Sequence, residues 1–189
     1  MRLGRPLKVA VVGSGFAGSL LARILNRQGH RVHLLERARH PRFALGESST
    51  PLTALCLERL AAHYGLEDLS WLAEYGRWER HPGGLRHGLK RGFTFYAHTP
   101  GEPYRNGPRN ENRLLVAASP SDEVADGHWL RADVDAYMVE RAAAEGVEYL
   151  DGVELAGVER RDDGFRLTGT RAGDAGTRAG DAGTRAGDA

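Results

Sequence analysis

The glycine-rich segment near the start of the chain constrains its fold more than any other feature. Residues 8–12 form a largely apolar run, and Gly13, Gly15 and Gly18 follow it in the spacing GxGxxG. A helical pattern comes next and leads to a second apolar run that ends at Glu36. A buried strand, glycines, a helix and an acid in this order form the dinucleotide-binding βαβ fingerprint. The sequence therefore predicts a Rossmann-like fold.

Each part of this segment has a physical role. Gly13 permits a tight turn after the strand, Gly15 lets the backbone approach a pyrophosphate, and Gly18 lets the helix lie close to the sheet. The first helical residues, Phe16 and Ala17, present free N–H groups and the positive end of the helix dipole to phosphate oxygens. These five residues are expected cofactor contacts.

The acid at the end of the second strand is expected to bind the ribose of the cofactor. Glu36 lies 18 residues after Gly18, where its carboxylate is expected to accept hydrogen bonds from the ribose hydroxyls of an adenosine, with Arg37 beside it. A carboxylate here would repel a 2′-phosphate, so the pattern disfavours NADP.

Two other interpretations fit the first residues less well. A coincidental glycine-rich turn would not explain the strand, the helix and the acid together. A secretory signal peptide would account for Arg2, Arg5 and Lys8 before the apolar run at 9–22. It would not account for three glycines inside that run or for the acid placed after it.

Composition excludes several function classes. With 189 residues and a formal net charge of +1, the chain has no strong attraction for nucleic acid or a membrane surface. No apolar run is long enough to span a bilayer, and no spacing of histidines resembles a zinc site, so no metal is expected. The single cysteine, Cys56, lies in an apolar helical pattern. We expect it to be a buried structural thiol in a reducing, cytoplasmic compartment.

The end of the chain has a different composition. Residues 169–189 repeat Gly-Thr-Arg-Ala-Gly-Asp-Ala three times, without an apolar side chain large enough to bury a face. We expect this tail to be disordered, which leaves 1–168 as the folded part.

The pattern of the folded part predicts an α/β protein. The expected elements are helices at 51–64, 69–75 and 132–145, strands at 85–96 and 147–150, and a hairpin of 153–158 with 165–167. The 51–64 helix has complete end signals in Thr50, Pro51 and Gly65. We predict a Rossmann-like βαβ domain with an inserted antiparallel β layer at about 85–128. Only three parallel strands are in view, so the sheet is expected to be incomplete at the C-terminus, as in the first part of a larger enzyme.

The expected strand at 85–96 has two faces. Phe93 and Phe95 fall on one face, which we expect to pack into the core. Lys90 falls on the other face with Gly92 and Thr94, a small polar surface suited to lining a cavity. On this pattern alone, a solvated surface lysine is the simpler interpretation of Lys90.

With these residues in view, 8–167 resemble the flavin-dependent, tryptophan-type halogenases, within the FAD-dependent monooxygenases and geranylgeranyl-reductase-like flavoproteins. The fingerprint is shared by the whole group and points to FAD. The segment at 46–51, Gly-Glu-Ser-Ser-Thr-Pro, is similar to the strap that connects the flavin and substrate sites of halogenases. Lys90 lies where that family carries its catalytic lysine, and Arg131 resembles the group's flavin-contacting arginine.

The resemblance implies a specific chemistry. Reduced FAD, supplied by a separate flavin reductase, reacts with oxygen, and a halide ion is oxidised. Lys90 then receives or orients the electrophilic halogen beside a small-molecule substrate, either as a hydrogen-bond donor or as an amine of depressed pKa. The further flavin contacts implied are Gly46, Glu47, Ser48, Ser49 and Arg131.

The chain departs from the halogenase pattern in one motif. Trp71, Trp78 and Trp129 are isolated, and the Trp-x-Trp-x-Ile-Pro motif is absent; in the family that motif comes after the region that these 189 residues match. Two alternatives therefore stay open. One is an FAD-dependent monooxygenase or geranylgeranyl-reductase-like oxidoreductase without halide chemistry, and the other is a truncated, inactive dinucleotide-binding fragment.

Overall fold

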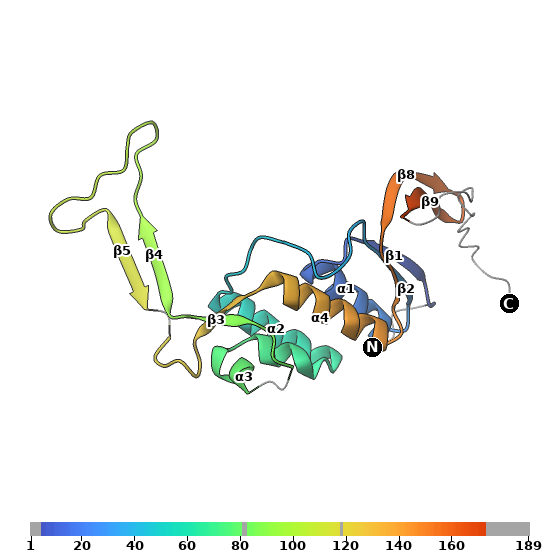
Figure 1. The fold of residues 1–189 in the computed structure, drawn as a ribbon, viewed down its shortest axis with the longest axis horizontal. Helices are drawn as coiled ribbons and strands as arrows, with labels where there is room; N and C mark the ends of the chain where they lie inside the picture. Colours follow the sequence, from blue (N-terminus) through green and yellow to red (C-terminus); the bar gives the residue numbers. More distant parts are fainter. Residues whose placement is uncertain (1–4, 81–82, 118, 173–189) are drawn as a thin grey trace. The chain divides into compact units, whose positions relative to one another are not determined.

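The computed structural model describes residues 5–80, 83–117 and 119–172 (Figure 1). The chain divides into two compact units. One unit contains the residues up to Leu45 and those from Arg131 onward, and the other runs from Gly46 to Leu130. No helix among the described residues is both long enough and apolar enough to cross a membrane.

The first unit contains the predicted βαβ arrangement. Strand β1 (Lys8–Val12), helix α1 (Phe16–Arg27) and strand β2 (Arg31–Leu35) follow one another, and helix α4 (Arg131–Ala144) leads into strand β7 (Glu148–Leu150). The strands form a parallel sheet in the order β1-β2-β7, which confirms the Rossmann-like fold class.

One face of this sheet is covered by α1 and α4, which lie side by side (Figure 1). The buried core between sheet and helices consists of Val11, Ala22, Val32, Leu34, Val139, Ala142 and Val147. The other face is more open, because the side chain of Val12 is 62% exposed. The expected buried strand is therefore covered on one face only, with Val11 as its buried residue, and among the described residues β1 lies at the edge of the sheet.

A buried ion pair joins the two helices. The guanidinium of Arg23, which is fully buried, donates to both carboxylate oxygens of Glu145 at 2.7 and 3.1 Å. The amide of Asn26 donates to the backbone oxygen of the same glutamate at 2.7 Å. This end of α4 is thereby held to α1 by polar contacts in addition to apolar packing.

An antiparallel hairpin completes the first unit, as predicted. Strand β8 (Val153–Arg161) pairs with strand β9 (Gly164–Arg171). The boundary expected at 168 is wrong, because residues 169–171 continue β9 and pair with residues 153–155. Strand pairing uses backbone groups, so these residues need no large apolar side chain. The remainder of the predicted disordered tail, from Gly173, lies outside the described residues.

The second unit begins with helical elements. Helix α2 (Pro51–Tyr64) has the predicted bounds: Thr50 is its N-cap and accepts from Thr53 N at 3.3 Å, and Gly65 ends it at φ 66°. The short helix expected at 69–75 is replaced by a 3₁₀ segment, η1 (Glu67–Leu72), and helix α3 (Tyr75–Glu79).

Cys56 is exposed on α2, so the expected buried thiol is wrong. The helix buries the face of Leu57 and Ala61, whereas Leu52 and Leu55 are 68% and 42% exposed. The apolar side chains of this helix are spread around it, so their spacing did not define a single inward face.

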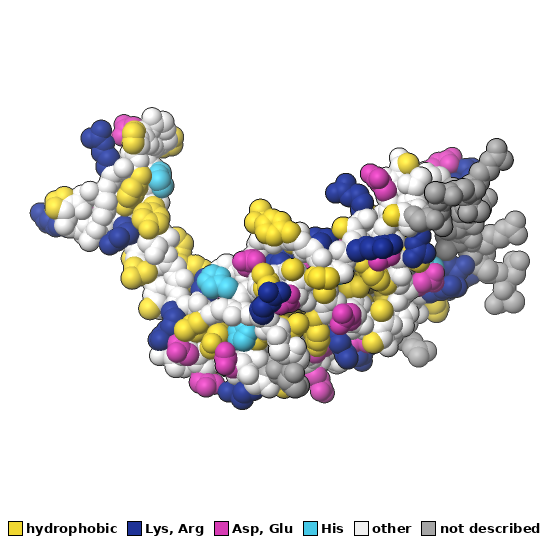
Figure 2. Space-filling model, viewed as in Figure 1, with side chains coloured by type: hydrophobic (Ala, Val, Ile, Leu, Met, Phe, Trp, Pro, Cys, Tyr) yellow, Lys and Arg dark blue, Asp and Glu magenta, His cyan; other side chains and the backbone are white. Residues whose placement is uncertain are grey.

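The strand expected at 85–96 is broken at Arg91. Strand β3 (His87–Lys90) pairs with β6 (Asp126–Trp129), and β4 (Gly92–Tyr96) pairs with β5 (Arg113–Ala117) in a separate antiparallel sheet. The residues between β4 and β5 complete an antiparallel hairpin (Figure 1). Phe95 is 55% exposed, so the expected packing of this face into the core is also wrong. Figure 2 shows hydrophobic side chains at the surface of this hairpin.

Candidate functional site

The fingerprint turn has the geometry that dinucleotide binding requires. Gly13 adopts φ 94°, a conformation that favours glycine, and its N–H donates to the carbonyl of Leu35 at 2.7 Å. A Cβ on Gly18 would lie 1.9 Å from the carbonyl oxygen of Gly13. The turn and the helix can therefore approach each other only with glycine at position 18.

Gly15 faces side-chain ends instead of backbone. A Cβ there would lie 3.4 Å from an Arg42 guanidinium nitrogen, 3.7 Å from one of Arg131 and 3.7 Å from a carboxylate oxygen of Asp135. Two cations thus flank the N-terminus of α1, with Phe16 half-buried and Ala17 exposed in its first turn. This combination of a glycine, a helix N-terminus and arginines suits a bound pyrophosphate.

Arg131 is held in place at the start of α4. Its guanidinium donates to both oxygens of Asp135 at 2.9 and 3.0 Å and to the carbonyl of Leu45 at 2.9 Å. Asp135 is fully buried, so its charge is compensated by this bidentate pair. The sequence resemblance singled out Arg131 but not Asp135, although their spacing of four residues on a helix indicates such a pair.

Glu36 is at the centre of a hydrogen-bond network. One carboxylate oxygen accepts from the backbone N–H of Ser14 at 2.8 Å, from the Ser14 hydroxyl at 3.1 Å and from Arg42 at 3.4 Å. The other accepts from the N–H of Ala38 at 2.9 Å. Burial raises the pKa of Glu36, but these hydrogen bonds and Arg42 outweigh it and hold the pKa below its ordinary value. The side chain is therefore a carboxylate near neutral pH.

The loop after β2 adds polar groups that sequence reasoning missed. His40 Nε2 lies 2.7 Å from the Ser14 hydroxyl, and burial, then the charge of Arg42, lower the pKa of this imidazole. Within the described ranges, the buried Nε of Arg42 has no hydrogen-bond partner. The Arg42 Nε donor and the Glu36 carboxylate lie near each other. A ligand that carries both a hydrogen-bond acceptor and a donor would fit this pair. Arg37, in contrast, is exposed.

The strap lies in the second unit and pairs with β6. The carbonyl of Glu47 accepts from Trp129 N at 2.7 Å, Ser48 forms an antiparallel bridge with His128, and Ser49 N donates to the Gly127 carbonyl at 3.0 Å. The Ser49 hydroxyl also accepts from Gly127 N at 2.9 Å. Gly46, Glu47 and Ser48 are exposed, whereas Ser49 is buried.

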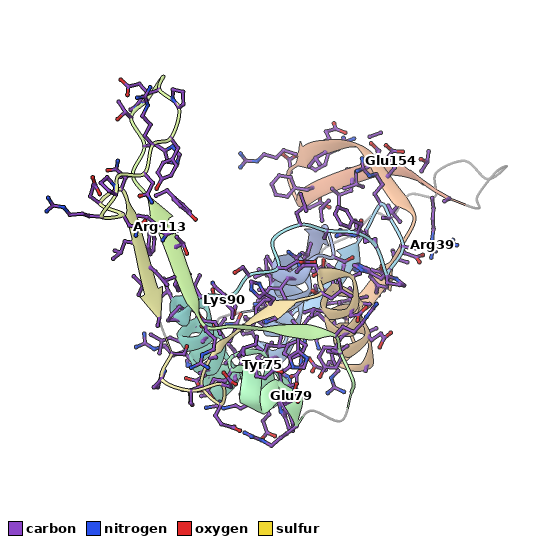
Figure 3. All side chains as sticks on the ribbon, turned by 60° about the vertical axis from the view of Figure 1, so that its left-hand side comes forward. Arg39, Tyr75, Glu79, Lys90, Arg113 and Glu154 are labelled. Carbon is purple, nitrogen blue, oxygen red and sulfur yellow. The ribbon has the colours of Figure 1, made fainter. Side chains whose placement is uncertain are left out.

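Lys90 is buried, which excludes the solvated surface lysine. Its side chain is 8% exposed, and its ammonium donates to the backbone carbonyl of Ser49 in the strap. The same nitrogen lies 3.9 Å from the centre of the Phe93 ring, within range of a cation–π contact. Figure 3 shows Lys90 at the end of β3, where the chain turns into the hairpin. The break at Arg91 thus lets Lys90 meet a side chain expected on the opposite face.

One acid faces this lysine from the neighbouring strand. Asp126 is the register partner of Lys90 in the β3–β6 pair and is 4% exposed. Burial lowers the pKa of Lys90, and the carboxylate of Asp126 opposes that shift. Burial likewise raises the pKa of Asp126, and the charge of Lys90 opposes it. Sequence reasoning missed Asp126, because antiparallel register between distant strands has no local signal.

The predicted site residues therefore form two groups. The fingerprint glycines, Glu36 and Arg131 come together in the first unit, and the strap and Lys90 come together in the second. Each group is internally connected by hydrogen bonds between residues far apart in sequence.

Comparisons with known proteins agree with the first group. Residues 11–64 match the NAD(P)-binding Rossmann-like domain family. The chain is 31% identical over 160 residues to monodechloroaminopyrrolnitrin halogenase PrnC of Pseudomonas fluorescens, covering 85% of this chain and 27% of the relative. It is 32% identical over 165 residues to tetracycline 7-halogenase of Kitasatospora aureofaciens, covering 87% of this chain and 29% of the relative. The chain thus spans less than a third of these halogenases.

Solved structures give the same relationship. The halogenase PltM in complex with phloroglucinol and FAD superimposes with a TM-score of 0.70 at 26% identity, covering 88% of this chain and 31% of PltM. The flavin-dependent halogenase CmlS, at 24% identity and a TM-score of 0.60, supports the fold alone. The predicted resemblance to flavin-dependent halogenases is confirmed in sequence and in fold.

Proposed function

We propose that this chain is the FAD-binding part of a halogenating oxidoreductase. It is an FAD-binding Rossmann-like domain related to flavin-dependent halogenases. The overall reaction consumes reduced FAD, O₂, a halide ion, a proton and the substrate C–H compound. It yields oxidised FAD, the carbon–halogen product and two molecules of water. The substrate is an electron-rich small molecule, because the halogen arrives as an electrophile.

The observation that carries this proposal is the burial of Lys90 against the strap. The charged ammonium of lysine is strongly hydrated, so removing it from water costs free energy. Its burial against a backbone carbonyl and an aromatic ring therefore indicates a functional role for the charge. A buried lysine beside an acid is a common mark of a functional site. Lys90 is also the residue to which the family resemblance assigns the catalytic role.

The two groups of residues have separate tasks in this proposal. Gly13, Gly15 and Gly18, with the first turn of α1, hold the pyrophosphate, and Glu36 accepts hydrogen bonds from the ribose. When bound, reduced FAD would supply two electrons to oxygen, and the partly reduced oxygen would oxidise the halide. Arg42 and Arg131 neutralise the phosphate charges, and Lys90 presents N–H donors to the activated halogen.

The strap is assigned a coupling role. The backbone carbonyl of Ser49 accepts a hydrogen bond from the Lys90 ammonium, and that of Glu47 accepts one from Trp129 N. Its sequence neighbours Gly46 and Ser48 complete the expected flavin contacts, and Arg37 adds a cation near the adenosine. We expect Glu47→Gln to alter flavin affinity or reoxidation before it alters the position of halogenation.

The proposed partners follow from the reaction. A separate flavin reductase supplies reduced FAD, chloride or bromide supplies the halogen, and no nucleic acid or membrane takes part. We place this reaction in the cytoplasm, where reduced nicotinamide for the reductase is available.

The test uses protein expressed from the complete open reading frame that contains this sequence. It is supplied with FAD, a flavin reductase and its nicotinamide donor, oxygen, bromide and electron-rich phenols or indoles. Products are identified by mass spectrometry from the bromine isotope pattern. A brominated product supports the proposal. A product that gains only oxygen supports the monooxygenase alternative, and flavin binding without any product supports the inactive fragment.

A further inference from the structure

The acid opposite Lys90 has no assigned task in the chemistry above. Asp126 is almost fully buried at the start of β6, directly across from Lys90 at the end of β3. Among the residues that the structure describes, its Oδ2 has no hydrogen-bond partner. A buried carboxylate without full compensation is costly, so its placement beside a buried ammonium indicates an electrostatic role.

We propose that Asp126 is a positioning residue that keeps Lys90 protonated and directed at the strap. Lys90 then acts as a hydrogen-bond donor toward the activated halogen and not as an amine that forms a covalent nitrogen–halogen bond. This inference rests on the proposed function for its consequence, but the pairing itself is testable without any turnover.

Two contacts and one facing carboxylate together favour the charged form of Lys90. The Ser49 carbonyl accepts a hydrogen bond from the ammonium, the Phe93 ring offers the negative face of its π system at 3.9 Å, and the carboxylate of Asp126 lies opposite in the strand register. Each of these favours the ammonium over the neutral amine. Burial acts in the opposite direction, and Asp126 is the one formal charge that opposes it from the paired strand.

The other charged groups near this pair are already engaged. Glu58 and Glu74 line a small hollow together with Asp126, and both pair with Arg77, at 2.9 and 2.7 Å. Arg91, which follows the lysine, pairs with Asp122 at 2.8 Å. Because these other charges are paired elsewhere, we expect the protonation of Lys90 to depend mainly on Asp126.

Three further titratable side chains lie on the paired strands and the strap. His128 on β6 pairs in register with Gly88 and is exposed, and the side chain of Glu47 is exposed as well. His87 on β3 is held by Leu85 and by the rings of Tyr75 and Trp78, at the other end of the strand. Solvent screens the exposed groups, so their influence on Lys90 is smaller than that of Asp126.

The closing experiment measures how Lys90 titrates in the chain itself. Competitive labelling with acetic anhydride between about pH 7 and pH 11, read out by peptide mass spectrometry, follows the fraction of free amine. In Asp126→Asn the labelling midpoint should move to lower pH, and a shift of one pH unit raises labelling below the midpoint about tenfold. Asp126→Glu should restore most of the original midpoint.

Asp122→Asn is the matched control, because it removes a nearby exposed carboxylate that pairs with Arg91. It should leave the Lys90 midpoint unchanged. An unchanged midpoint in folded Asp126→Asn would overturn the inference. If circular dichroism shows that this variant does not fold, the reciprocal variant Lys90→Gln decides. Removal of the ammonium should raise the pKa of Asp126 measured by carbon-13 NMR, and an unaltered pKa there would overturn the inference.

The consequence for turnover is measured separately. In the protein from the complete open reading frame, Asp126→Asn should shift the alkaline limb of the halogenation pH profile toward lower pH, because the ammonium is lost earlier. A limb that stays in place while the labelling midpoint moves would overturn the donor role. An absence of halogenation in the unsubstituted protein would overturn the proposed function and leave the labelling result standing.

Discussion

The Lys90 ammonium donates a hydrogen bond to the backbone carbonyl of Ser49, 41 residues earlier in the chain. The contact ties the end of β3 to the strap, and the strap in turn pairs with β6. A change at the lysine therefore acts on three segments that are distant in sequence. This connection is the physical basis for treating the lysine and the strap as one site.

The first prediction concerns Lys90→Met, which keeps an unbranched stem under Phe93 but removes the charge. The variant should bind FAD and consume oxygen with reduced flavin as before, because the fingerprint is untouched. Product formed per flavin oxidised should fall by about a hundredfold or more, the usual scale for loss of a group that acts on the reacting atoms. Arg91→Met, at the adjacent exposed residue, should keep normal coupling. Normal coupling in Lys90→Met would instead favour the monooxygenase or reductase alternative.

The second prediction concerns Gly15→Val. The new side chain would extend toward the guanidinium groups of Arg42 and Arg131, where a pyrophosphate is expected to lie. Affinity for FAD, measured by calorimetric titration, should fall by more than about tenfold. Ala144→Val adds similar bulk at an exposed position of α4 and should leave affinity unchanged. Equal affinity for FAD in Gly15→Val and the parent chain would contradict the assignment.

Local signals in the sequence were sufficient for the elements with clear ends. Helix α2 could be predicted to the residue because Thr50, Pro51 and Gly65 define its ends without reference to the rest of the fold. The fingerprint was equally predictable, because the tight contact between Gly18 and the Gly13 carbonyl arises within six residues. Such features depend on short-range sterics, which a sequence pattern records directly.

Features that depend on distant partners could not be predicted in this way. The residues on both sides of Arg91 have strand character, but β3 pairs with β6 and β4 with β5, and only that choice places Lys90 beside Phe93 and Asp126. The inward face of α2 is likewise decided by what packs against it, and for this reason Cys56 is exposed.

The third prediction concerns the buried pair that joins α1 to α4. Glu145→Ala leaves the fully buried Arg23 without its carboxylate, which should lower the free energy of unfolding by about 3–5 kcal/mol. Glu159→Ala, which removes an exposed pair with Arg161 on β8, should change it by no more than about 1 kcal/mol. Urea denaturation followed by circular dichroism distinguishes these values. Similar losses in both variants would show that the buried pair contributes no more than a surface one.

The last prediction concerns the pH dependence that Glu36 confers. Its pKa is held below the ordinary value by the N–H groups of Ala38 and Ser14, the Ser14 hydroxyl and Arg42, despite burial. A carboxyl with a lowered folded pKa stabilises the protein fully above its unfolded pKa, about 4.3, and loses that contribution as the pH falls through the folded value. Glu36→Gln should therefore be less stable than the parent chain near pH 7, and the difference should shrink below about pH 4. Urea midpoints recorded across this pH range provide the measurement, with Glu159→Gln as an exposed control. A stability difference that stays constant from neutral to acidic pH would show that the Glu36 network does not depend on the charge of its carboxylate.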